Sequence, residues 1–150
     1  MRKRFFHQKL WLAAAIGWML FIWSNSMQTA AESSQQSSGV LEVLLPLLSW
    51  TGLPAELWHT LIRKMAHMTE FALLGLFWTA SLSSGRSEVS DIDWKSQSVV
   101  LVICLLTALV DETIQLFVPG RSGEILDVWI DSMGALMGVV GIILAKCIKR

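Results

Sequence analysis

Two apolar segments joined by a short polar connection constrain this chain more than any other feature of its sequence. Residues 99–110 and 128–145 are too apolar and too poor in charge for ordinary soluble elements, and the polar stretch between them contains a Pro-Gly turn at 119–120. A helix needs about 20 mostly apolar residues to cross a bilayer. The segments therefore predict two membrane helices joined at one membrane face.

Four carboxylates stand where these two helices meet the connection: Asp111, Glu112, Asp127 and Asp131. An ionisable group inside a membrane is costly, so such groups face a bundle interior or a cavity rather than lipid. We therefore expect a polar site between helix ends.

Composition agrees with a membrane protein. The chain has 150 residues, of which 53% are hydrophobic, and its mean hydropathy is +0.53. We predict one domain over residues 1–150, an all-α integral membrane bundle. It has four transmembrane helices, with a short interfacial or re-entrant helix between the first and the second. No phosphate-binding loop, serine-hydrolase elbow, zinc motif or nucleic-acid surface is evident.

The first apolar run, residues 10–23, follows a basic flank and can be extended to Met27. A short apolar run after basic residues also fits a secretory signal, with 29–31 as a poor cleavage site. Tryptophans in the run suit interfacial anchoring, so we expect the segment to be retained.

The next residues, 25–39, have the composition of an exposed polar loop. Residues 40–53 are apolar, short and broken by Pro46, which removes a backbone donor. This segment predicts an interfacial or re-entrant element that could act as a lid over the site.

The second spanning helix is predicted from about residue 54 or 57 to residue 84. Arg63, His67 and Glu70 recur at i, i+4 and i+7 and so share one helical face, with Lys64 beside them. The alternative is that the two bases only anchor the helix at the lipid head groups.

A polar loop follows, then a third helix over residues 97–117 and a fourth from residues 124–127 to Lys146. On the fourth helix Asp131, Gly134 and Gly138 lie on one face. Small residues four apart let membrane helices approach closely, and we expect packing within the chain rather than dimerisation.

The basic residues set the predicted orientation. With four spans, nine of them fall on the side of both termini and three on the other: Arg63, Lys64 and Arg121. The positive-inside rule then places both termini in the cytoplasm, and the polar site opens outward from the cell membrane.

Three motifs in order resemble the VanZ-like membrane proteins, a family named for a teicoplanin-resistance protein. They are Arg63-Lys64 with His67, Glu70 and Phe71; Asp111-Glu112 with Gln115, Phe117 and Pro119-Gly120-Arg121; and Asp127 with Asp131 and Gly134. The family's opening Ser/Gln motif is matched loosely by Ser24, Ser26 and Gln28. Phe71 stands where members commonly carry Tyr, and Asp131 where many carry Asn. The resemblance implies several spans, this polar cluster and, for some members, glycopeptide resistance.

The cluster has more negative than positive charge, with five carboxylates (Glu70, Asp111, Glu112, Asp127, Asp131) against three bases. One hypothesis is a binder of an anionic envelope lipid or cell-wall precursor, in which Arg63, Lys64, Gln115, Arg121 and Asp131 hold the ligand. A second is an enzyme dependent on a divalent cation, acting on a lipid-linked envelope substrate, with His67, Glu70, Asp111, Glu112 and Asp127 as catalytic groups. In a third, the cluster only joins the helix ends. No cofactor other than that cation is predicted.

Pairing inside the cluster is also predicted. The connection between the last two helices is short, so Arg121 should contact Asp127 or Glu112. Glu70 should contact His67, Arg63 or a group on the third helix, and Asp131 should face helix packing rather than lipid.

Overall fold

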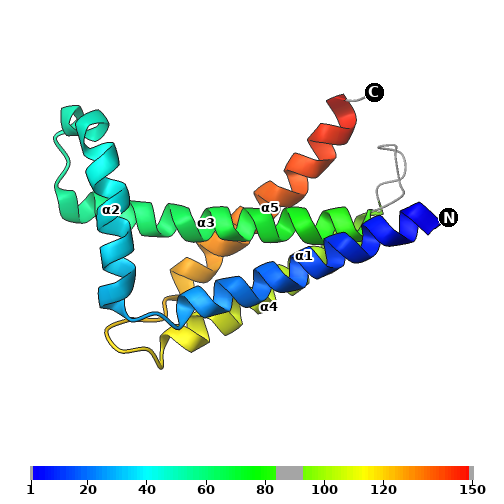
Figure 1. Ribbon diagram of the computed structural model, residues 1–150, viewed down its shortest axis with the longest axis horizontal. Helices are drawn as coiled ribbons and strands as arrows, with labels where there is room; N and C mark the ends of the chain where they lie inside the picture. Colours follow the sequence, from blue (N-terminus) through cyan, green and yellow to red (C-terminus); the bar gives the residue numbers. More distant parts are fainter. Residues whose placement is uncertain (1, 84–92, 149–150) are drawn as a thin grey trace.

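The computed structural model describes residues 2–83 and 93–148, and in these ranges every regular element is helical (Figure 1). The all-α prediction is therefore confirmed. The elements are α1 (Arg2–Ser26), α2 (Ala30–Leu48), the 3-10 turn η1 (Ser49–Thr51), α3 (Ala55–Leu82), α4 (Trp94–Gln115) and α5 (Ile125–Ile148).

Four long helices form the bundle, and α2 lies crosswise at one end of it. In Figure 1, α1 and α4 run side by side, α3 runs above them and α5 crosses behind α3. The chain termini lie at the opposite end from α2. We call the end that holds α2, the C-terminal turns of α1 and α4 and the first turns of α3 and α5 the polar end.

The tightest packing is between α3 and α5, and glycines make it possible. A Cβ added at Gly134 or Gly138 would collide with backbone carbonyls of α3, and one added at Gly75 would collide with the backbone of α5. Small residues allow this backbone approach. The expected packing of the glycine face of the last helix within the chain is confirmed.

In the described ranges, three helices are long and apolar enough to cross a membrane: residues Phe5–Ser26 of α1, α4 and α5. Large apolar side chains cover their outer faces, among them Leu106, Trp129 and Met137. The second predicted span, α3, does not reach the same hydropathy, because its first half includes the basic and acidic stripe around His67.

The segment between α1 and α3 differs from the prediction. Residues 30–39 are helical rather than a loop, and α2 continues through Pro46 to Leu48. The cause is a capping box, in which Thr29 Oγ accepts from the Glu32 N–H while Glu32 accepts from both the N–H and the hydroxyl of Thr29. Pro46 lies within the last turn and does not divide the helix.

The other boundaries lie close to those predicted. Helix α4 begins three residues earlier than expected, because Asp93 accepts hydrogen bonds from the Lys95 N–H and the Ser96 hydroxyl and so caps it. Arg86, Lys149, Arg150 and most of the predicted loop before α4 lie outside the described residues.

Candidate functional site

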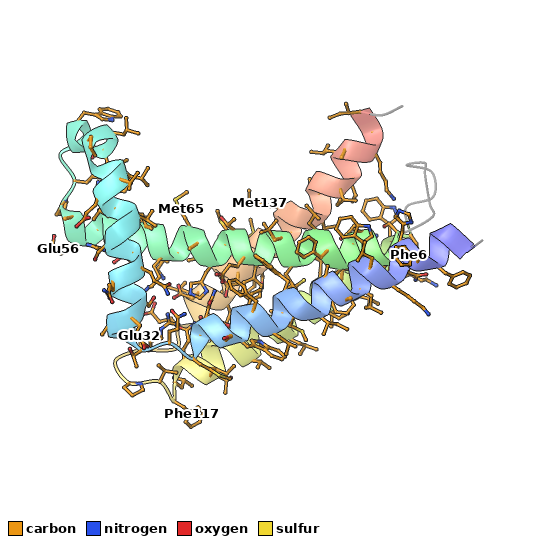
Figure 2. The ribbon with its side chains drawn as sticks, viewed as in Figure 1. Phe6, Glu32, Glu56, Met65, Phe117 and Met137 are labelled. Atoms are coloured by element: carbon orange, nitrogen blue, oxygen red, sulfur yellow. The ribbon has the colours of Figure 1, made fainter. Side chains whose placement is uncertain are left out.

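The predicted site residues come together at the polar end. They lie on α3, α4, α5 and the connection between α4 and α5, as the sequence predicted, and α1 and α2 contribute further polar groups. Figure 2 shows Glu32 and Phe117 at this end of the molecule and Phe6 at the other. The convergence of three helices on one polar region is therefore observed.

Asp111 is the most enclosed carboxylate, with no exposed surface. Its Oδ1 accepts from the Ser26 hydroxyl at 2.5 Å, and its Oδ2 accepts from Gln115 Nε2 at 3.0 Å. His67 Nδ1 lies 4.0 Å from the same Oδ2. Residues of α1, α3 and α4 thus meet at one buried carboxyl group.

Glu112 ties the end of α4 to the start of α5. One of its oxygens accepts from Gln115 Nε2 at 3.1 Å, and the other accepts from the backbone N–H of Glu124 at 2.8 Å. Because a Cβ at Gly123 would collide with the Glu112 carbonyl, only glycine lets the connection pass this close. A carboxylate at the first turn of α5 also suits the positive end of that helix.

Glu70 has a different partner from the one predicted. Its Oε1 accepts from Asn25 Nδ2 on α1 at 2.8 Å, and the Trp18 indole donates to the Glu70 carbonyl at 2.9 Å. We expected Glu70 to contact His67, Arg63 or a group on the third helix; among the described residues none of these donates a hydrogen bond to its carboxylate, because α1 packs against this face of α3 and its Asn25 supplies the donor.

The pairing of Arg121 was also predicted wrongly. Asp127 pairs instead with Lys64, whose Nζ also lies 3.8 Å from Glu124. Arg121 Nη1 donates to the Ser26 carbonyl at 3.5 Å, and within the described ranges no carboxylate lies within 4.0 Å of its guanidinium. Burial, together with the nearby charge of Arg63, lowers the pKa of Arg121.

The turn before Arg121 explains its direction. Gly120 has φ +76°, a left-handed conformation that glycine adopts without strain, and the Pro119 carbonyl accepts from the Ala30 N–H at 3.3 Å. The connection is thereby held against the start of α2, so Arg121 extends toward the end of α1 rather than toward α5.

Asp131 is buried, with 1% of its surface exposed, so the prediction that it faces the bundle is confirmed. Neither of its carboxylate oxygens has a hydrogen-bond partner among the described residues, and the same is true of His67 Nδ1. Ligand atoms of His67, Asp111 and Asp131 all lie within 4.8 Å of one another.

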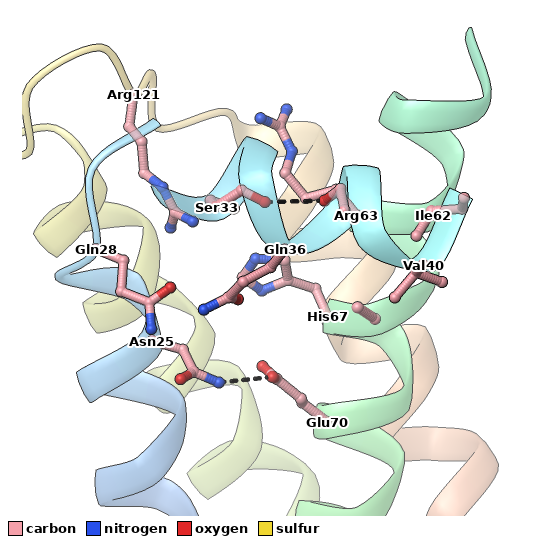
Figure 3. A pocket seen from close by; sticks show the side chains of 12 residues that line it. Asn25, Gln28, Ser33, Gln36, Val40, Ile62, Arg63, His67, Glu70 and Arg121 are labelled. Atoms are coloured by element: carbon pink, nitrogen blue, oxygen red, sulfur yellow. Dashed lines mark hydrogen bonds between the residues drawn. The ribbon is translucent and has the colours of Figure 1, made fainter. Parts of the chain in front are cut away.

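A polar cavity of about 170 Å³ opens beside this cluster (Figure 3). Arg63, His67, Glu70 and Arg121 line it, together with Ile62 and Ala66 of α3, Asn25 and Gln28 from the end of α1, and Ser33, Gln36, Ser37 and Val40 of α2. In Figure 3 the hydrogen bond from Asn25 to Glu70 crosses its lower part. On the α2 side, Ser33, Gln36 and Ser37 cover it together with Val40, the first residue of the 40–53 segment that was expected to act as a lid.

An apolar cavity of about 470 Å³ adjoins the polar one. The two share four lining residues, Val40, Ile62, Ala66 and Glu70, and the apolar one continues between α1, α2 and α3 along Trp18, Phe21, Leu44, Met65, Thr69 and Leu73. Phe21 and Met65 are exposed, so this cavity reaches the outer surface of the bundle.

The polar residues from α1 and α2 were not predicted as site residues. One signal was available, because Thr29-Ala-Ala-Glu32 has the spacing of a capping box and so marks the start of a helix over the polar stretch. Once that stretch is helical, Ser33, Gln36, Ser37 and Val40 fall on one face.

Three apolar helices and a polar cluster buried among helix ends define a helical membrane protein with an internal polar site. The family model VanZ/LLP1 matches residues 11–146, and the chain belongs to this family. No curated protein and no solved structure matches the chain.

Proposed function

We propose that this protein binds an anionic lipid of the cell envelope, with the head group in the polar cavity and an acyl chain in the apolar cavity. The observation that supports this most directly is that the two cavities adjoin and share the lining residues Val40, Ile62, Ala66 and Glu70. An amphiphile has the same division between a charged and an apolar part. A soluble cell-wall fragment would use only the polar half.

The charge of the polar cavity favours an anion. Lys64 is engaged by Asp127 and Glu124, but Arg63 and Arg121 line the cavity, and in the described part of the chain neither forms an ion pair with a carboxylate. The buried Nε of Arg121 also has no hydrogen-bond partner among these residues. Two guanidinium groups that line one cavity repel one another, an anion between them would offset this repulsion, and arginine suits phosphate and carboxylate.

Amide and hydroxyl groups would complete the head-group site. Gln28, Gln36 and Ser33 line the cavity near Arg121, and each can donate to a phosphate or sugar oxygen. Head groups with hydroxyls, such as a glycerol phosphate, match this set of donors.

The membrane placement is part of the proposal. At about 1.5 Å per residue, the 28 residues of α3 span about 42 Å, which exceeds a hydrocarbon core of about 30 Å by about 12 Å, so about the first two turns can lie at the head-group level while the rest crosses the core. With α3 as the fourth span and α2 in the interface, both termini lie on the same side of the cell membrane. The excess of basic residues there favours the cytoplasm.

The test uses the full-length protein in nanodiscs that contain phosphatidylglycerol or phosphatidylcholine, with retained lipid counted by native mass spectrometry. We expect selective retention of phosphatidylglycerol. Arg121→Gln should abolish it, and Arg121→Lys should weaken it strongly, because lysine keeps the charge but loses the planar pair of donors. Lys95→Gln removes a positive charge at the opposite end of α4 and is the matched control. Equal retention of both lipids, or a silent Arg121→Gln, contradicts the proposal.

The apolar half is tested separately. Ala66→Trp places a bulky ring where the two cavities join, and it should reduce lipid retention. Leu105→Trp is the control, because Leu105 lines a different apolar cavity, between α4 and α5. If both tryptophan variants behave alike, the acyl chain does not lie between α1, α2 and α3.

Resistance to glycopeptides such as teicoplanin is the cellular consequence we propose, and it rests on the family relationship. A protein that holds an anionic envelope lipid changes the surface at which a glycopeptide acts. In a susceptible host, expression should raise the inhibitory concentration of teicoplanin, and Arg121→Gln should remove the effect. Full protection by the Arg121→Gln protein would separate resistance from lipid binding.

A further inference from the structure

We infer that His67, Asp111 and Asp131 bind one divalent cation, Zn²⁺ or Mn²⁺, between α3, α4 and α5 directly behind the polar cavity. The three side chains come from three different helices, and their ligand atoms already lie within 4.8 Å of one another. This inference goes beyond lipid binding and does not depend on it.

The spacing requires only a small adjustment. Ligand atoms about 2.0 to 2.2 Å from a metal ion are at most about 4.4 Å apart. His67 Nδ1 and Asp111 Oδ2 are 4.0 Å apart, within that limit. A small change in the side-chain torsion angles of Asp131 would bring its carboxylate oxygen within the limit as well.

Asp131 gives the independent reason to expect a ligand. Its carboxylate is 1% exposed, and neither oxygen has a hydrogen-bond partner among the described residues. A buried carboxylate without a partner costs several kcal/mol in its charged form. An ion placed between Asp131 and Asp111 would satisfy the orphaned oxygens and neutralise both charges.

The neighbouring bases do not meet this need. Lys64 forms ion pairs with Asp127 and Glu124, and over the described ranges neither Arg63 nor Arg121 lies within 4.0 Å of Asp131. A cation from outside the chain would supply the positive charge that these three bases do not bring within 4.0 Å of Asp131.

The donor set selects the kind of ion. Imidazole suits Zn²⁺ and other transition metals, whereas carboxylates also suit Mn²⁺, Mg²⁺ and Ca²⁺. Because Ca²⁺ takes six to eight oxygen ligands, one nitrogen and two carboxylates favour Zn²⁺ or Mn²⁺. Ser26 and Gln115, which donate to the two oxygens of Asp111, would hold that ligand in place.

The position of the ion relative to the cavity follows from His67, because this residue both lines the polar cavity and belongs to the trio of ligands. His67 lines the polar cavity, while Asp111 and Asp131 lie behind it. Three protein ligands leave at least one coordination position on a four-coordinate ion. An oxygen of water or of an anionic ligand could take it, which is the arrangement that a cation-dependent enzyme would require.

The first experiment titrates Zn²⁺ and Mn²⁺ into metal-free, full-length protein in detergent micelles, followed by calorimetry. We expect one ion per chain. Asp131→Asn keeps the side-chain shape but removes the charge, and it should weaken binding by more than the roughly 10- to 100-fold that loss of an outer-shell partner causes. Glu124→Gln is the matched control, because Glu124 is a half-exposed carboxylate just before α5 and outside the trio, and the affinity of this variant should stay within a few-fold of the parent.

The second measurement is thermal unfolding with and without Zn²⁺, which distinguishes a folded variant that has lost the ion from a variant that does not fold. Saturating Zn²⁺ should raise the Tm of the parent and of Glu124→Gln, and it should leave the Tm of Asp131→Asn and Asp111→Asn unchanged. Arg121→Gln should bind the ion as the parent does, which separates this inference from the lipid proposal. Absence of binding by the parent, or binding that survives Asp131→Asn, overturns it.

Discussion

At the scale of single residues, the free-energy cost of burying a charge predicted which carboxylates face the bundle interior, but it did not predict which groups pair with them. Asp111 and Asp131 were expected inside the bundle, and they are buried. The partners of Glu70 and Arg121 were not predictable, because they depend on how far α1 extends along the bundle and how the Pro119-Gly120 turn directs the chain. Sequence spacing gives the face of a helix but not which neighbouring helix covers it.

Ser26 gives the first prediction. Its hydroxyl donates to the fully buried Asp111, so Ser26→Ala leaves a buried acceptor with one partner fewer and should lower the free energy of unfolding by about 1 to 3 kcal/mol. Ser24→Ala, two residues earlier on an exposed side chain, should change it by less than about 0.5 kcal/mol. Unfolding in mixed micelles measures both. Equal effects would mean that the hydrogen bond contributes little.

At the scale of elements, α2 shows where composition misleads. Its residues 30–39 are polar and small, which favours a loop, yet the reciprocal hydrogen bonds of Thr29 and Glu32 start a helix there. The capping box was visible in the sequence. The crosswise position of α2 was not, because it depends on the hydrogen bond from Ala30 to Pro119 in a distant connection.

The second prediction concerns acid. Hydrogen bonds from Thr29 hold the pKa of Glu32 below its ordinary value. The stability this cap contributes is therefore present above the ordinary pKa of a glutamate and is lost as the pH falls through the lowered value. Hydrogen exchange, corrected for intrinsic rates, should show the first turn of α2 losing protection on acidification. Glu32→Gln should remove that pH dependence, and an unchanged profile in this variant would exclude Glu32 as its source.

The third prediction concerns the contact between α3 and α5. A Cβ at Gly138 would collide with the Ala72 carbonyl, so Gly138→Ala should destabilise the protein by about 1 to 3 kcal/mol. Gly141, one turn further along α5, has open space around it, and Gly141→Ala should be neutral or stabilise by up to about 1 kcal/mol. Both variants are compared by unfolding in micelles. Similar values for the two would show that α5 can move away from α3 at little cost.

At the scale of the whole molecule, the order of helices and the gathering of the motifs at one end followed from hydropathy and helical spacing. Among the described residues, three helices are long and apolar enough to span a membrane, and both termini lie at the end opposite the polar site. The two adjoining cavities could not be predicted, because they form between α1, α2 and α3 and so depend on the position of α2, whose residues 30–39 were predicted as a loop.

The fourth prediction tests the topology. A reporter that works only in the cytoplasm should be active when it is fused after Arg150 or inserted near Asp93, and inactive when it is inserted at Ser37. The positive-inside rule gives this orientation. Activity at Ser37 would reverse it and would place the polar cavity on the cytoplasmic side.

The apolar cavity reaches the outer surface of the bundle at Phe21 and Met65, and in a membrane this surface faces lipid. A ligand with an acyl chain would therefore arrive sideways, by diffusion within one leaflet, and would not have to leave the bilayer. Occupancy would then follow the mole fraction of that lipid in its leaflet. Dilution of the whole sample would leave the bound fraction unchanged, whereas dilution with a neutral lipid would empty the site.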